Sequence, residues 1–212
     1  MSLLIDPVLV TENQLYADKG IYFVSTNPTP GTPIVFAVTA APSETAGYFL
    51  SIKNTEAANG KRVYLDYLRL LCGVVPASAT AAEMFVKLDT AGWTSGGTQC
   101  NPVNVNGDLS TASVADVRAG ALTTAARVAA RLVTRNKLRT VIPVAGDEWI
   151  FSFGNPELSN STVFNGTNPQ RMPIGLPPVV IAPQAFALVQ LWFPGNAITP
   201  AQFEFELGLI ER

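Results

Sequence analysis

Carboxylates are the first side chains in this sequence whose type and spacing could perform chemistry. Asp147 and Glu148 are adjacent in "AGDEW", and Glu204 and Glu206 are two residues apart in "QFEFELGLI". Paired carboxylates cleave glycosidic bonds when one protonates the leaving group and the other activates water or attacks the sugar. Adjacent strand residues point to opposite faces, so Asp147 and Glu148 are expected to shape a turn into a strand. Glu204 and Glu206 would lie roughly 7 Å apart on one face, which we interpret as a solvated strand face.

The amino-acid composition excludes several other catalytic mechanisms. Histidine is absent, which excludes Ser-His-Asp and Cys-His triads, the HExxH zinc motif and imidazole bases. Cys72 and Cys100 form no CxxC pair, cannot complete a four-cysteine zinc site, and are expected to be buried and reduced. Neither GxxxxGK[ST] nor GxGxxG occurs. We therefore expect no enzymatic activity, no catalytic residue, no metal and no cofactor.

A row of basic residues is the second candidate site. It consists of Arg127, Arg131, Arg135 and Arg139, with Lys137 beside them. A spacing of four aligns side chains on one face of a helix and, because four is even, on one face of a strand as well. Stacking aromatics are missing between residues 94 and 148, and the net charge is -2, so we expect no nucleic-acid partner. Arginine also suits contacts with acidic or carbonyl-rich protein surfaces. We expect a contact with another subunit here, with a merely solvated face as the alternative.

Trp93 precedes a loop rich in Gly, Asn and Pro, "SGGTQCNPVN" at 95–104. An exposed indole there could stack on a sugar. We favour a core or interface anchor, and we include Trp93 with the basic row as a contact candidate.

The elements that must position these side chains are mostly strands. Short runs rich in β-branched and aromatic residues alternate with clusters of Gly, Pro, Asn and Ser, which is typical of a β-sandwich. The runs are "IYFV" (21–24), "PIVFAVTA" (33–40), "GYFLSIKN" (47–54), "RVYLDYLRLL" (62–71), "EMFVKLD" (83–89), "EWIFSF" (148–153), "AFALVQLWF" (185–193) and "QFEFELGLI" (202–210). In the last run Phe203, Phe205, Leu207 and Leu209 share one face, as in a half-buried antiparallel strand. We predict an all-β, jelly-roll-like antiparallel β-sandwich with an N-terminal arm.

Two stretches depart from this pattern. Residues 1–32 have few apolar residues and two turns with Pro, so they form either an arm that docks on a neighbour or a first edge strand with its loop. Residues 33–212 would form the sandwich. In the alanine-rich segment 119–134 we favour strands, and a short helix is the alternative because alanines favour helices and Thr123 or Thr124 could cap one.

Charged residues are scarce in this sequence, and their scarcity indicates that the protein binds partners. Charged residues make up 14% of the chain, about half the usual share of about 25%. Part of the exterior is therefore expected to be buried against partners. No stretch approaches the ~20 apolar residues of a membrane helix, and the start lacks the features of a signal peptide, so no membrane partner is expected.

Several phrases resemble a family of structural proteins from tailed-bacteriophage virions, the jelly-roll head decoration, or cement, proteins. The phrases are "WTSGGT" (93–98), "NPVNVN" (101–106), "AGALT" (119–123) and "LRTVIPVAGDEW" (138–149), with "YLDYLRLL" (64–71) and "PPVVIAPQAFALVQLWFP" (177–194) around them. The resemblance covers about two-thirds of the chain and carries no catalytic motif.

The resemblance implies a non-enzymatic protein on the outside of a phage head, made in the cytoplasm of the bacterial host. Its partners would be the major capsid protein, whose neighbouring subunits it bridges, and copies of itself in a homotrimer. The alternatives are another virion part, such as a head-fibre base or a tail protein, and a carbohydrate-binding module or glycan hydrolase. A groove lined by aromatics and paired carboxylates would favour the last.

Overall fold

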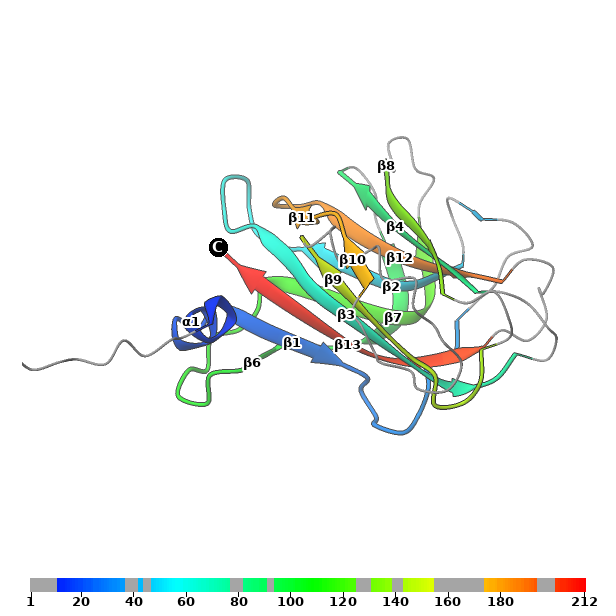
Figure 1. The fold of residues 1–212 in the computed structure, drawn as a ribbon. Helices are drawn as coiled ribbons and strands as arrows, with labels where there is room; N and C mark the ends of the chain where they lie inside the picture. Colours follow the sequence, from blue (N-terminus) through cyan, green and yellow to red (C-terminus); the bar gives the residue numbers. More distant parts are fainter. Residues whose placement is uncertain are drawn as a thin grey trace, which may run out of the picture.

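The predicted strands assemble into two facing β-sheets in a computed structural model of the chain (Figure 1). The structure describes residues 11–36, 42–43, 47–76, 82–90, 94–124, 131–138, 143–154, 174–193 and 201–212. The described elements are α1 (Glu12–Asp18), β1 (Tyr22–Thr26), β2 (Tyr48–Asn54), β3 (Val63–Val74), β4 (Glu83–Asp89), β5 (Thr94–Gln99), β6 (Val103–Asn104), β7 (Ala115–Thr124), β8 (Arg131–Lys137), β9 (Glu148–Phe153), β10 (Ile174–Leu176), β11 (Val180–Ile181), β12 (Phe186–Trp192) and β13 (Gln202–Glu211).

Sheet A has the order β10-β9-β3-β13-β1-β6, with β11 also paired to β3, and sheet B has the order β5-β7-β2-β12-β4-β8. Four antiparallel strand pairs define the topology, two in each sheet. They are β1 with β13, β2 with β12, β3 with β9, and β4 with β8. Each successive pair is nested inside the previous one along the chain, and the pairs alternate between the sheets. That nesting is the rolled-up hairpin of a jelly roll, which confirms the predicted fold class.

The core lies between the sheets and is rich in aromatic rings. The Phe49 ring packs edge-on against Phe203, and Phe193 stacks on Phe203 with centroids 6.3 Å apart. Phe203, Phe205, Leu207 and Leu209 are all buried, as the alternation of β13 predicts. Most predicted runs form strands within a residue or two of the expected bounds. In the run 33–40, Ile34 forms only an isolated bridge to Phe203, and residues 37–41 lie outside the described part.

Residues 11–32 of the segment proposed as an arm pack into the body of the protein. Thr11 caps α1 in a reciprocal capping box with Gln14, and β1 pairs with β13 on one side and β6 on the other. Within the described part, β1 is therefore a strand inside sheet A and not at its edge. Residues 1–10 lie outside the described part.

The alanine-rich segment forms strands where it is described, namely β7 and the start of β8, and residues 125–130 lie outside the described part. No helix among the described residues combines the length and hydropathy needed to cross a membrane.

Candidate functional site

The basic row lies on β8, at one edge of sheet B. Arg131, Arg135 and Lys137 belong to this strand. Arg127, Arg139 and Trp93 lie outside the described residues. Among the described strands β8 pairs only with β4, so it is the last described strand on this side of sheet B. We call the exposed residues Arg131, Leu132 and Arg135 the β8 edge.

A β-bulge divides this row. Leu132 lies opposite Lys87 and Thr134 opposite Val86, which leaves Val133 as the extra residue. Arg131 consequently faces Leu88, which packs against the core, whereas Arg135 faces Phe85, whose ring contacts Trp192 outside the core. Cross-strand neighbours project to the same face. The shared face that the four-residue spacing predicts is therefore not formed between Arg131 and Arg135.

Arg135 is held by its own chain. Its Nε donates to Glu83 Oε2 at 2.6 Å, and its guanidinium lies over the Phe85 ring, 5.4 Å from the centroid. The Glu83 side chain is only 6% exposed, whereas that of Arg135 is 55% exposed. The hydrogen bond that Arg135 donates to Glu83 raises the pKa of Arg135. Arg135 thus compensates a buried carboxylate, which the basic spacing did not indicate.

Arg131 and Leu132 are the parts of the β8 edge that are open to a partner. Leu132 is 56% exposed, and Arg131 is also exposed. The two side chains project from opposite faces of β8, because Arg131 lies opposite Leu88 and Leu132 lies opposite Lys87. A partner strand added at this edge would therefore meet the guanidinium on one face and the apolar side chain on the other. The backbone of Lys137 pairs with Glu83 at the end of β8.

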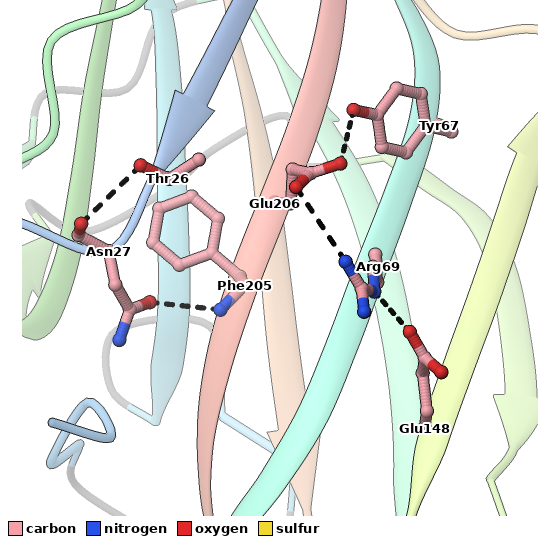
Figure 2. Close-up of polar contacts among 7 residues, drawn as sticks. All are labelled: Thr26, Asn27, Tyr67, Arg69, Glu148, Phe205 and Glu206. Atoms are coloured by element: carbon pink, nitrogen blue, oxygen red, sulfur yellow. Dashed lines mark hydrogen bonds and ion pairs between the residues drawn. The ribbon is translucent and has the colours of Figure 1, made fainter. Parts of the chain in front are cut away.

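The outer face of sheet A carries a chain of polar contacts that crosses three strands (Figure 2). Tyr67 Oη on β3 donates to Glu206 Oε1 on β13 at 2.6 Å. The other carboxylate oxygen of Glu206 lies 3.8 Å from Arg69 Nη1, and Arg69 Nε donates to Glu148 on β9. The Glu148 side chain is 2% exposed, so Arg69 neutralises a buried carboxylate and a partly exposed one together.

A second set of contacts continues along the same face toward α1. Tyr22 Oη donates to Asp66 Oδ2 at 2.5 Å, and Asn13 Nδ2 on α1 donates to the same oxygen at 3.1 Å. Burial, together with the hydrogen bond to Asp66, raises the pKa of Tyr22. Burial and the hydrogen bond to Glu206 raise the pKa of Tyr67 in the same way. Both phenols therefore remain proton donors at neutral pH.

Gly208 on β13 makes room for these two tyrosines. A Cβ atom at this position would lie 2.4 Å from Tyr67 Cε1 and 2.8 Å from Tyr22 Oη. Only glycine allows both rings to lie across β13 at this point. The sequence signal for this close approach is the single glycine that interrupts the alternation in "FEFELGLI".

The carboxylates of the sequence analysis now have defined roles. The Asp147 carboxylate accepts from the amide of Val144 in a turn where Gly146 has φ +87°, whereas Glu148 pairs with Arg69. The predicted turn is therefore confirmed. Glu204 and Glu206 lie on the same outer face, but Glu206 is engaged by Tyr67 and Arg69 rather than only solvated, and Glu204 accepts from the amide of Gly31 at 3.0 Å.

Metal and thiol chemistry have few candidate groups. Within the described ranges no cluster of three or more His, Cys, Asp or Glu side chains is arranged to hold a metal ion. Cys72 and Cys100 are buried and free, as predicted, and burial raises the pKa of each thiol to about 11. Both are therefore weak nucleophiles at neutral pH.

Comparisons of the chain with protein-family models, with curated protein sequences and with solved structures found no match.

Proposed function

We propose that this chain is a non-enzymatic structural protein of a tailed-bacteriophage virion, and that it decorates the outside of the head. The jelly-roll strand order supports the proposal, because this architecture recurs in viral capsid proteins. The sequence phrases shared with head decoration proteins point the same way. The observation that carries the proposal is the β8 edge, the last described strand on one side of sheet B, where Arg131 and Leu132 are exposed on opposite faces of the strand.

The mechanism of such a protein is mechanical. The open side of β8 would pair with an extended segment of the major capsid protein, Leu132 would be buried in the contact, and Arg131 would bind carboxylates or carbonyls. A homotrimer would present three such edges, and each could engage a different capsid subunit. Several modest contacts made at once give strong attachment without a single tight site. Bridging adjacent subunits adds interface free energy that the pressure inside the head must overcome.

A reconstitution experiment tests this function. Heads purified from a phage in which the gene for this chain is deleted are mixed with the purified protein, sedimented, and analysed for occupancy. We expect the wild-type chain to bind at a fixed number of copies per head. Arg131→Glu should lower occupancy about tenfold or more, because it reverses the charge at the contact.

Arg62→Glu makes the same change of charge at another exposed position and serves as the matched control. Occupancy of this variant should equal that of the wild type. If the chain is absent from purified virions, or if it does not bind the deleted heads, the proposal is wrong. Binding to tails in place of heads would assign the chain to another virion component.

A further inference from the structure

Four of the five tyrosines lie on the outer face of sheet A or beside it, namely Tyr16, Tyr22, Tyr64 and Tyr67. Their hydroxyls are held by polar partners. Tyr22 donates to Asp66, Tyr67 donates to Glu206, and Tyr16 accepts from Arg212 at 3.1 Å. We call these four residues, with Asp66, Arg69 and Glu206, the tyrosine face. It combines apolar rings with hydrogen-bonding groups of fixed orientation.

The tyrosine face is hollowed at both ends. One hollow, of about 240 Å³, lies among Thr26, Asn27, Arg69, Glu204 and Glu206. The other, of about 390 Å³, lies between α1 and the start of β3 and is lined by Tyr16, Tyr64, Asp66 and Arg212 among others.

Both hollows lie along β3 and β13. β13 extends from Glu204 in the first hollow to Ile210 in the second, a distance of roughly 20 Å for a strand of this length. Tyr22 and Tyr67 lie between them, over Gly208. The face is thus long enough for an extended ligand of several linked units.

The charges of this face indicate the class of ligand. Its carboxylates outnumber its guanidinium groups. The carboxylates that line the two hollows are Glu12, Asp66, Glu204 and Glu206, and the guanidinium groups are Arg69 and Arg212. Arg69 already contacts two carboxylates, and Arg212 lies over the Tyr64 ring, 4.8 Å from its centroid. An anionic ligand would therefore meet net repulsion, whereas a ligand with many neutral hydroxyl donors would meet a surplus of acceptors.

We propose that the tyrosine face binds a neutral oligosaccharide. Sugar hydroxyls would donate to Asp66, Glu204 and Glu206, while the apolar faces of the sugar rings would pack on Tyr67 and against the stacked pair of Tyr64 and Arg212. Jelly rolls occur in lectins as well as in capsid proteins. The hollow beside α1 brings the aromatic side chains of Tyr16 and Tyr64 together with the carboxylates of Glu12 and Asp66. This binding is independent of attachment through the β8 edge, so one chain could hold a particle and a glycan together.

The test begins with an array of neutral and anionic glycans and continues with titration calorimetry. The probes are cellohexaose, maltohexaose and N-acetylated chitohexaose, with a hyaluronan hexamer as the anionic comparison. We expect at least one neutral probe to bind, and hyaluronan not to bind. Tyr64→Ala should weaken binding about tenfold, because it removes a stacking surface.

Tyr67→Phe is a second variant, which keeps the ring and removes only the hydroxyl that orients Glu206. It should also weaken binding. Arg131→Ala, on the β8 edge, is the control and should leave glycan affinity unchanged. The proposal is overturned if no neutral glycan binds, if only the anionic glycan binds, or if both tyrosine variants bind as tightly as the wild type. Occupancy of the tyrosine variants on phage heads, which should equal that of the wild type, separates this failure from failure of the virion proposal.

Discussion

The outer faces of the two sheets differ in a way that their strand order does not reveal. In sheet A, β13 alternates between buried and half-buried residues over most of its length, so its outward side chains reach solvent. In sheet B, β12 is buried at every position from Phe186 to Leu191. Side chains alternate along a strand, so half of those buried residues point away from the core. Leu188, for example, is fully buried although its neighbours Ala187 and Val189 are the ones that face the core.

As a consequence, polar side chains are buried on the outer face of sheet B and partly exposed on the outer face of sheet A. On sheet B, Lys87 and Gln190 are buried, and both donate to the Ser43 carbonyl, at 3.4 and 3.3 Å. Glu83 is buried against Arg135. On sheet A the equivalent groups form the half-exposed tyrosine face. The comparison teaches that sheet B is buried on both faces along β12, whereas the outer face of sheet A along β13 is half-exposed.

The largest expected effect is a loss of stability that differs between the outer faces of the two sheets. Leu188→Ala should destabilise the protein by about 2–5 kcal/mol, because it opens a cavity in buried packing. Ile150→Ala, at a half-buried outward position of β9 in sheet A, should cost less than half as much. Urea denaturation of both variants measures the difference. Equal losses would show that the two outer faces are packed alike and would break the comparison.

A substitution at Gly208 sharpens the description of sheet A. Gly208→Ala should cost about 1–3 kcal/mol, because the added methyl group overlaps the Tyr67 and Tyr22 rings. It should also disrupt the hydrogen bond from Tyr67 to Glu206. Denaturation gives the loss of stability, and near-ultraviolet circular dichroism reports the rearranged tyrosines. An unchanged tyrosine spectrum would mean that these rings do not cross β13 as described.

The two arginines of the β8 edge should respond differently, with smaller effects. Arg135→Ala removes the partner of the buried Glu83, so the urea midpoint should fall. Arg131→Ala should leave the midpoint unchanged, because Arg131 is exposed. Adding Glu83→Gln to Arg135→Ala should restore part of the loss, since a neutral amide is easier to bury than an unpaired carboxylate. If Arg131→Ala is the more destabilising variant, the division of the row by the bulge is wrong.

The smallest expected effect is a loss of folding stability at alkaline pH. The folded-state pKa values of Tyr22 and Tyr67 are raised above the ordinary value, which is about 10 in an unfolded chain. Their contribution to stability is thus fully present below pH about 10 and is lost as pH rises toward the folded-state values. The double variant Tyr22→Phe/Tyr67→Phe should lose less stability above that pH than the wild type does. Urea denaturation of both proteins at a series of alkaline pH values measures this difference, and phenolate absorbance follows the ionisation of the tyrosines. A titration in which all tyrosines ionise together near their ordinary value would contradict the prediction.

Much of the fold could be predicted from local patterns. The alternation of β13 identified its buried face correctly, and the runs at 83–89 and 148–153 match β4 and β9. The apolar run of β12 contains the signal of burial on both faces, since only Gln190 interrupts it. The helix α1 was not predicted, although "TENQ" at 11–14 has the spacing of a capping box.

The sites were less predictable because they depend on contacts between distant parts of the chain. Glu206 meets Tyr67 across a separation of 139 residues, and such a partner depends on strand register rather than on local spacing. The bulge at Val133 likewise has no mark in the sequence, yet it divides the basic row. Arg135 was predicted as a contact residue because its spacing was visible, while its partner Glu83 lies on another strand.

The central claim is that the chain attaches to a phage head through the β8 edge and leaves the tyrosine face open. An electron cryomicroscopy map of the decorated head, at a resolution that shows side chains, tests this most directly. We predict density for a capsid segment beside Arg131 and Leu132, with Tyr64 and Tyr67 exposed to solvent. A map in which sheet A lies against the shell while β8 faces solvent, or in which the head lacks the chain, would contradict the account.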